Sequence, residues 1–185
     1  MRIAIMLLVC ACGSSAPKTV EIPTSEGGED CTSSIEDAKP GNADRFAFEA
    51  DDGKHGYKNA KGEVVIPPTL SFAYEFKPAG IAGVVTGDGH FAFIDPSGNE
   101  VARAYAFDNG PDYFQEGHAR IVDGAGKIGF ISQSGRIAIA PAFDRADSFC
   151  HGAARVERDG RTYFIDKRGV ETAEPNGTLG DGSEE

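Results

Sequence analysis

One short pattern occurs four times in this chain of 185 residues, and it limits the possible folds more than any other feature. Each copy ends its central turn with a glycine, and these glycines are 36, 37 and 34 residues apart. Self-similarity at such a period is typical of repeat proteins, in which each unit buries its apolar surface against the next. The copies read KHGYKNAKGEVVI from Lys54, HFAFIDPSGNEVA from His90, KIGFISQSGRIAI from Lys127 and RTYFIDKRGVET from Arg161.

Each copy is predicted to contain a β-hairpin. Its glycine is the fourth residue of a tetrad that starts with Asn, Asp or Ser, as in a type I turn closed by a glycine bulge. A second turn precedes each tetrad, and no segment shows helical periodicity. We therefore predict an all-β fold of four three-stranded antiparallel meander repeats of about 36 residues. The tetrads are Asn59–Gly62, Asp95–Gly98, Ser132–Gly135 and Asp166–Gly169.

An aromatic residue occupies one equivalent position in every repeat, and we expect these rings to form a single stacked ladder in the core. The next position is Ile94, Ile131 or Ile165 in three of the repeats. Since neighbouring residues of a strand point to opposite faces, these isoleucines leave open whether the second face is buried as well. The expected core residues are Tyr57, Phe93, Phe130 and Phe164.

The repeats place a β-repeat domain at 45–172. The segment 12–44 before it is acidic, rich in Ser, Gly and Pro, and without apolar periodicity, so we predict a disordered tether. The segment 173–185 is predicted to be a disordered acidic tail. For the domain itself we expect an open twisted array with terminal repeats as caps, and the alternative is a small propeller-like ring.

The chain starts with one basic residue, Arg2, followed by the apolar run Ile3–Val9. This run is too short to span a membrane but long enough for the apolar region of a secretory signal. The residues Val9-Cys10-Ala11-Cys12 resemble a bacterial lipobox, in which the last cysteine is lipidated and becomes the first residue after cleavage. The resemblance implies a signal peptide at 1–11, lipidation at Cys12 and anchorage in the cell envelope, with Gly13 favouring the outer membrane. The alternatives are an ordinary cleaved signal and a disordered start.

The repeats resemble the WG-repeat family, also called KWG repeats. The segments that carry this resemblance best are KIGFISQSGRIAIAPAFDRADSFCHGAARV at 127–156 and KHGYKNAKGEVVIPP at 54–68. The family's tryptophan is replaced in all four copies, and the glycine after it is kept as Gly56 and Gly129. The family is mainly bacterial, often exported, and without a general catalytic activity. The residues in the tryptophan position are His55, Phe91, Ile128 and Thr162.

The sequence patterns that resemble ligand-binding motifs indicate ordinary turns. The segment Gly124–Gly129 spells G-x-G-x-x-G, but a dinucleotide site needs a helix after it and here a strand is expected. The segment Phe107–Asp112 has oxygen ligands but no calcium-loop spacing, and the four histidines have no metal-ligand spacing. We therefore predict no catalytic residue, no metal and no cofactor. The formal net charge of −11 disfavours binding to nucleic acid.

Two cysteines, Cys31 and Cys150, remain if Cys12 is acylated and Cys10 is removed with the signal. An even pair in an exported protein suggests a disulfide that would fasten the tether to the domain. Two free thiols are the equal alternative.

The function expected from these features is a membrane-tethered, non-enzymatic β-repeat module of the bacterial cell envelope. Its partners would be the lipid bilayer, through acylated Cys12, and an unidentified envelope protein or glycan. The alternative is an envelope hydrolase that cleaves a saccharide or peptidoglycan with carboxylates from the loops, which would lie about 5–10 Å apart in a cleft.

Overall fold

The computed structural model describes residues 44–77 and 80–175, and this part of the chain consists of β-strands joined by turns. It contains no helix that is long and apolar enough to cross a membrane. The strands are β1 (Phe46–Glu49), β2 (His55–Lys58), β3 (Val64–Leu70), β4 (Phe72–Ala73), β5 (Ala82–Val85), β6 (Phe91–Ile94), β7 (Glu100–Arg103), β8 (Ala106–Phe107), β9 (Gly110–Pro111), β10 (His118–Val122), β11 (Ile128–Ser132), β12 (Ile137–Phe143), β13 (Arg145–Ala146), β14 (Ala153–Arg158), β15 (Arg161–Asp166) and β16 (Glu171–Thr172).

These strands form four antiparallel meanders, which we call sheets 1 to 4 in chain order. Sheet 1 is β1-β2-β3, sheet 2 is β4-β5-β6-β7, sheet 3 is β10-β11-β12 and sheet 4 is β13-β14-β15-β16. Strands β8 and β9 form a separate hairpin between sheets 2 and 3. The all-β prediction is confirmed, with the addition of a short fourth strand in sheets 2 and 4 and of the extra hairpin.

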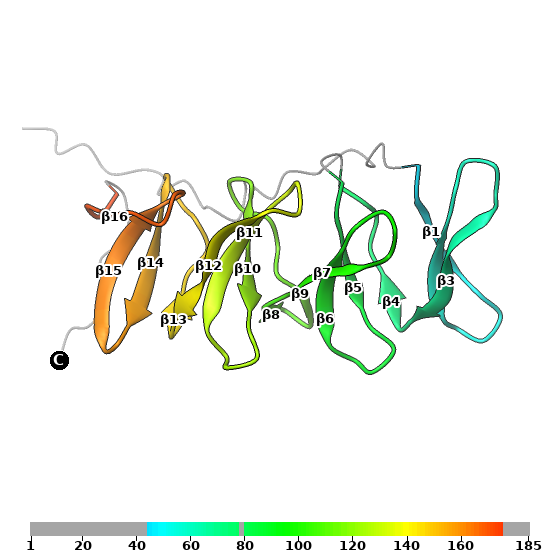
Figure 1. Ribbon diagram of the computed structural model, residues 1–185, viewed down its shortest axis with the longest axis horizontal. Helices are drawn as coiled ribbons and strands as arrows, with labels where there is room; N and C mark the ends of the chain where they lie inside the picture. The colour runs from blue at the N-terminus through cyan, green and yellow to red at the C-terminus, as the bar shows by residue number, and fades with distance from the viewer. Residues whose placement is uncertain (1–43, 78–79, 176–185) are drawn as a thin grey trace, which may run out of the picture.

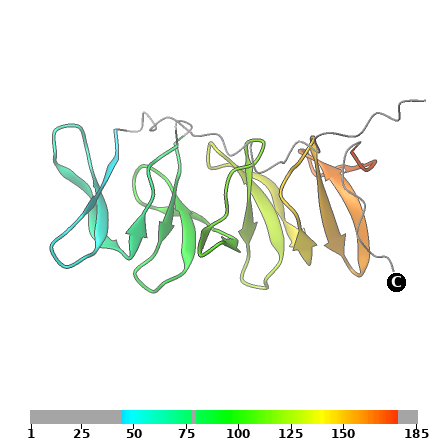
Figure 2. The same ribbon diagram turned by 180° about the vertical axis from the view of Figure 1, so that it is seen from behind.

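The four sheets follow one another along the long axis of the molecule (Figure 1). Sheet 1 and sheet 4 lie at opposite ends, and the view from behind shows the same order (Figure 2). The repeats therefore form an open array, as predicted, and the propeller-like ring is wrong.

The turn prediction is also confirmed in atomic detail. In each tetrad the glycine N–H donates to the carbonyl of the first residue, at 2.8–2.9 Å, and the glycine φ lies between 78° and 86°. The first residue also receives side-chain bonds; the Asp95 carboxylate, for instance, accepts from the backbone N–H of Ser97 and Asn99. A side chain is strained at such a positive φ, which explains glycine at this place in every repeat.

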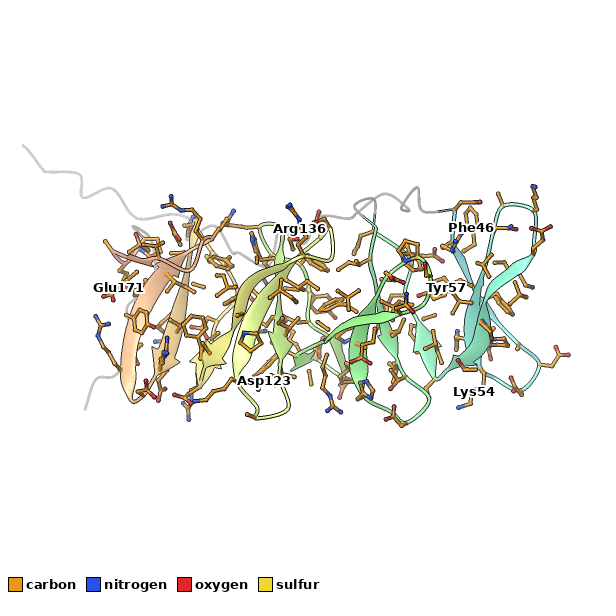
Figure 3. The ribbon with its side chains drawn as sticks, in the orientation of Figure 1. Phe46, Lys54, Tyr57, Asp123, Arg136 and Glu171 are labelled. Atoms are coloured by element: carbon orange, nitrogen blue, oxygen red, sulfur yellow. The ribbon has the colours of Figure 1, made fainter. Side chains whose placement is uncertain are left out.

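The core is divided into three layers, one between each pair of successive sheets. The first layer joins sheets 1 and 2 around Tyr57 and Ile94, and the second joins sheets 2 and 3 around Phe93 and Ile131. The third joins sheets 3 and 4 around Phe130. Figure 3 shows side chains filling the space between the sheets along the whole array.

The expectation of a single aromatic ladder is therefore wrong. Tyr57, Phe93 and Phe130 are at most 2% exposed, but each belongs to a different layer because a whole sheet separates it from the next. Each ring packs instead on a phenylalanine from the segment that leads into β5, β10 or β14 of the next sheet. The centroid distances are 4.8 Å for Tyr57–Phe76, 5.3 Å for Phe93–Phe114 and 4.7 Å for Phe130–Phe149.

Both faces of the middle strands are buried in the inner sheets. Ile94, Ile131 and Ile165 are at most 4% exposed, since each faces the preceding sheet. The two ends of the array differ from this pattern. Within residues 44–175 no sheet precedes sheet 1, and Lys58 takes the isoleucine position with its ammonium 4.1 Å from the Phe48 ring centroid. No described sheet follows sheet 4, so Phe164 is only half-buried and is not a full core residue.

Gly56 and Gly129 occupy a place where the neighbouring strand crosses very closely. A Cβ built on Gly129 would lie 2.5 Å from the Ile139 carbonyl oxygen and 2.5 Å from the Pro141 nitrogen. Strand β12 bulges over the glycine here, so that Ile128 pairs with Phe143 but Phe130 pairs with Ile139. Strand β3 makes the same crossing over Gly56, whose Cβ would lie 2.5 Å from the Ile66 carbonyl oxygen. A side chain at either position would overlap the backbone of the neighbouring strand, so both positions require glycine.

Candidate functional site

The predicted lipidation site and one of the two predicted disulfide cysteines, Cys12 and Cys31, lie outside the described residues. Cys150, at the end of the connection before β14, is disulfide-bonded. Its pairing with Cys31 stays a prediction, and the alternative of a free thiol at Cys150 is wrong for this structure.

The patterns that resemble ligand sites have local structural roles. Gly124–Gly129 forms the turn between β10 and β11 and the start of β11, so a strand follows the glycines as expected. Two of the histidines pack on aromatic rings: His55 lies 5.0 Å from Phe72, and His118 lies 5.1 Å from Phe149. The part of the chain that the structure describes has no group of three or more acidic, histidine or cysteine side chains arranged for a metal ion.

Two carboxylates converge on His90, which follows the second turn of the second repeat. The Nδ1 atom of His90 lies 2.9 Å from Asp88 Oδ1 and 3.0 Å from the Thr86 hydroxyl, and its Nε2 atom lies 2.9 Å from Glu100 Oε2. The Thr86 hydroxyl donates to the His90 carbonyl and accepts from the His90 N–H, so it closes its own hairpin. These contacts stabilise the turn. The alternative that the protein is an envelope hydrolase stays a hypothesis.

The hairpin β8–β9 interrupts the repeat between sheets 2 and 3. Its tip residues Asp108 and Asn109 both have positive φ, 46° and 62°, as a two-residue type I′ turn requires. The segment Phe107–Asp112, predicted to be a capped turn, is thus a complete hairpin with its own strand pair.

A buried ion pair lies at the base of this hairpin. The Asp112 carboxylate accepts two bonds from the Arg120 guanidinium, at 2.7 and 2.9 Å, and one from the Arg120 backbone N–H at 2.8 Å. The guanidinium also stacks on two rings, with centroids of Tyr105 at 4.5 Å and Phe107 at 5.2 Å. Burial lowers the pKa of Arg120, but the hydrogen bond and charge of Asp112 more than offset this, and the net shift is upward.

The same positions carry different residues in the first and third repeats. In the third repeat the pair is Asp147–Arg155, which is exposed and joined by a single 3.1 Å contact. In the first repeat the arginine position is Gly83, and this creates room for the hairpin. A Cβ on Gly83 would lie 2.7 Å from the Pro111 Cγ atom, so only glycine lets the hairpin lie on sheet 2.

Four exposed aromatic side chains surround the hairpin, and we call them the aromatic patch. The Phe72 and Tyr74 rings lie 4.9 Å apart, and the Phe107 and Tyr113 rings lie 6.0 Å apart. Tyr74 connects the two pairs: its hydroxyl is 2.9 Å from the place of a Cβ on Gly110, and its pKa is raised by burial and by Tyr113. The four side chains are 37–44% exposed.

Large rings of this kind are usually buried, and contiguous exposed aromatic surface is typical of interaction sites. The aromatic patch is therefore the candidate binding site of the described domain. The sequence alone does not reveal it because the four rings come from two different repeats. The one available signal was a difference in length: Gly98 and Phe114 are 16 positions apart, whereas Gly62 and Phe76, and likewise Gly135 and Phe149, are 14 apart.

A family model described as WG containing repeat matches residues 56–89 and 128–161. Both segments start at the middle strand of a sheet that contains the glycine crossing, β2 in sheet 1 and β11 in sheet 3. In the second repeat Ala92 takes the glycine position and pairs directly with Arg103, so β7 does not cross over it. No curated protein matches the chain.

Proposed function

This chain belongs to the WG-repeat family, and from that premise we propose that it is a lipid-anchored binding module of the bacterial cell envelope. In this proposal Cys12 carries the lipid, the segment 12–44 is the tether, and the β-array presents a surface to a partner without catalysing a reaction. The outer membrane is the proposed location.

The lipid anchor is supported by the start of the sequence. The run Ile3–Val9 has the length of a signal-peptide apolar region, and small residues follow it up to Cys12. Each buried methylene of an acyl chain contributes about 0.8 kcal/mol to membrane binding, so several chains hold a protein firmly at a bilayer. The disulfide at Cys150 is consistent with an oxidising compartment outside the cytoplasm.

The binding role rests on one observation, the aromatic patch. The array buries the rings of its core between the sheets, yet it leaves these four rings exposed beside one another. A chain selected only for stability would cover such surface, because each exposed ring forgoes burial that stabilises the fold. We infer that a partner covers the aromatic patch in the envelope.

Metabolic labelling with an alkyne analogue of palmitate tests the anchor. The wild-type chain and the Cys10→Ser variant should both be labelled and sediment with membranes, and Cys12→Ser should be unlabelled. A wild-type chain that takes no label would remove the anchor from the proposal. Label lost only in Cys10→Ser would move the anchor to Cys10.

A further inference from the structure

The aromatic patch has the chemistry of a site for positive charge. The face of an aromatic ring carries partial negative charge, and ammonium and guanidinium groups bind over it. The patch presents four such rings at its surface, two of them phenolic. The molecule already uses this chemistry at the same place, since the Arg120 guanidinium is stacked on Tyr105 and Phe107.

The charge of Arg120 is not available to an outside ligand. Its guanidinium is paired with Asp112, and the two side chains are only 9% and 2% exposed. The pair is therefore neutral and buried, and it leaves no net positive charge below the rings. An anionic ligand would find no cation to pair with among these buried groups.

Two exposed carboxylates are adjacent in the chain to rings of the patch. Glu75 follows Tyr74 in the chain, and Asp108 follows Phe107 at the tip of the hairpin. Among the residues that the structure describes, neither carboxylate has an ion-pair partner. Rings and unpaired carboxylates together complement a cation, and the net charge of −11 on the whole chain would attract one from a distance.

We propose that the aromatic patch binds a lysine- or arginine-bearing segment of a partner protein. The basic side chains lie over the faces of Tyr74 and Phe107, and Glu75 and Asp108 pair with their charges. This inference rests on the proposed binding role and names its partner's chemistry. A neutral saccharide could stack on the same rings, but it would not use the charge of the two carboxylates.

The test uses the full chain, purified in detergent, and a fluorescent peptide of alternating Gly and Arg. Anisotropy should report binding that weakens severalfold between low and physiological salt, since the contacts are exposed. Tyr74→Ala and Phe107→Ala should each weaken binding about twofold to fivefold, as expected for one exposed cation–π contact. Glu75→Gln should weaken it about twofold.

Matched controls lie elsewhere on the molecule. Phe46, at the sheet 1 end of the array, is 50% exposed, so Phe46→Ala removes a comparable ring outside the patch (Figure 3). Asp51 is an exposed carboxylate in the turn between β1 and β2, and Asp51→Asn removes the same charge there. Both controls should bind as the wild type does, and every variant should keep its thermal unfolding midpoint.

Three results would overturn the inference. The first is no peptide binding, and the second is binding that the two controls weaken as much as the patch variants. The third is binding of a chito-oligosaccharide, used as a neutral probe, that depends on Tyr74 while the arginine peptide does not bind. The labelling experiment tests lipidation independently of peptide binding. A chain that takes the palmitate label but does not bind the peptide would support the anchor and contradict this inference. A chain that binds the peptide but takes no label would support this inference and contradict the anchor.

Discussion

The Phe130 ring packs on the Phe149 ring with centroids 4.7 Å apart and an interplanar angle of 55°. The first comes from the middle strand of sheet 3 and the second from the connection between β13 and β14, so this contact joins two successive sheets. The contact recurs as Tyr57–Phe76 and Phe93–Phe114. The same ring contact thus holds each pair of successive sheets together.

Phe130→Ala should lower the free energy of unfolding by about 3–5 kcal/mol, because it removes a buried ring and leaves a cavity between two sheets. Phe164→Ala is the matched comparison, since the ring occupies the same repeat position but is only half-buried at the end of the array. Its cost should be less than half as large. Urea denaturation measures both values, and equal losses would show that sheet 4 is covered on its outer face.

Gly129→Ala should destabilise the domain by at least about 2 kcal/mol, since the new methyl group would overlap the backbone of Ile139 and Pro141. Gly124→Ala is the control. It lies in the turn before β11, has no positive φ and has no atom within 4 Å of the new Cβ, so its effect should stay within about 0.5 kcal/mol. Thermal unfolding of the two variants checks this, and similar midpoints would contradict the close crossing.

Asp112→Asn should cost about 3 kcal/mol or more, because it leaves the buried Arg120 guanidinium without its counter-charge. Asp147→Asn changes the equivalent residue of the third repeat, where the carboxylate and its Arg155 partner are 61% and 56% exposed. Its cost should be below about 1 kcal/mol. Denaturant midpoints distinguish the two, and a small effect at Asp112 would mean that water reaches the pair.

Stability should fall in acid partly through Glu116, whose carboxylate accepts from the Gly152 N–H and pairs with Lys167 at 2.9 Å. Burial raises the pKa of Glu116, but Lys167 and the Gly152 N–H lower it more, so the net shift is downward. A lowered pKa contributes stability above the ordinary glutamate value, and this contribution is lost as the pH falls through the lowered value.

Glu116→Gln should therefore be less stable than the wild type at pH 7, by less than about 1 kcal/mol because the pair is partly exposed. The difference should shrink to nothing as the pH falls below the glutamate range. Urea unfolding at pH 7 and pH 3 provides the comparison. A difference that stays constant with pH would show that the carboxylate charge has no part in it.

Mass mapping of the non-reduced protein should find one peptide that joins Cys31 to Cys150. Cys31→Ser should then leave Cys150 open to alkylation, while Cys10→Ser should not change it. A bridge that closes so long a loop contributes about 2–5 kcal/mol, and reduction should lower the unfolding midpoint accordingly. A Cys150 that stays protected in Cys31→Ser would assign the bridge to another cysteine.

The sequence predicted those parts of the fold that are local in the chain. The turn tetrads ending at Gly62, Gly98 and their equivalents need a specific backbone conformation, which residue type reveals directly. The open array was also the preferred prediction, although the spacing of the repeats does not by itself distinguish it from a closed ring. The prediction of an aromatic ladder was wrong because Phe93 and Phe130 face different core layers. An equivalent position in the repeat does not reveal whether a sheet lies between two side chains.

The aromatic patch could not be predicted because it arises where the repeat is broken. Tyr74 precedes the hairpin β8–β9 by about thirty residues, and the two meet only because Gly83 leaves space for Pro111. The segment 107–112 was recognised as a turn, but its role in bringing rings from two repeats together depends on packing. The burial of Ile131 likewise became visible only with the sheets in place.

The division of the core into three layers has a mechanical consequence. Among the described residues no buried side chain is shared between layers, so the removal of an end sheet breaks one layer and leaves the other two intact. Once the disulfide of Cys150 is reduced, a chain pulled between its two ends would therefore yield in steps, one sheet at a time from either end. The aromatic patch lies at the junction of sheets 2 and 3, so the unfolding of sheet 1 would remove the His55 ring that packs on Phe72 but leave the four rings of the patch attached to the inner sheets.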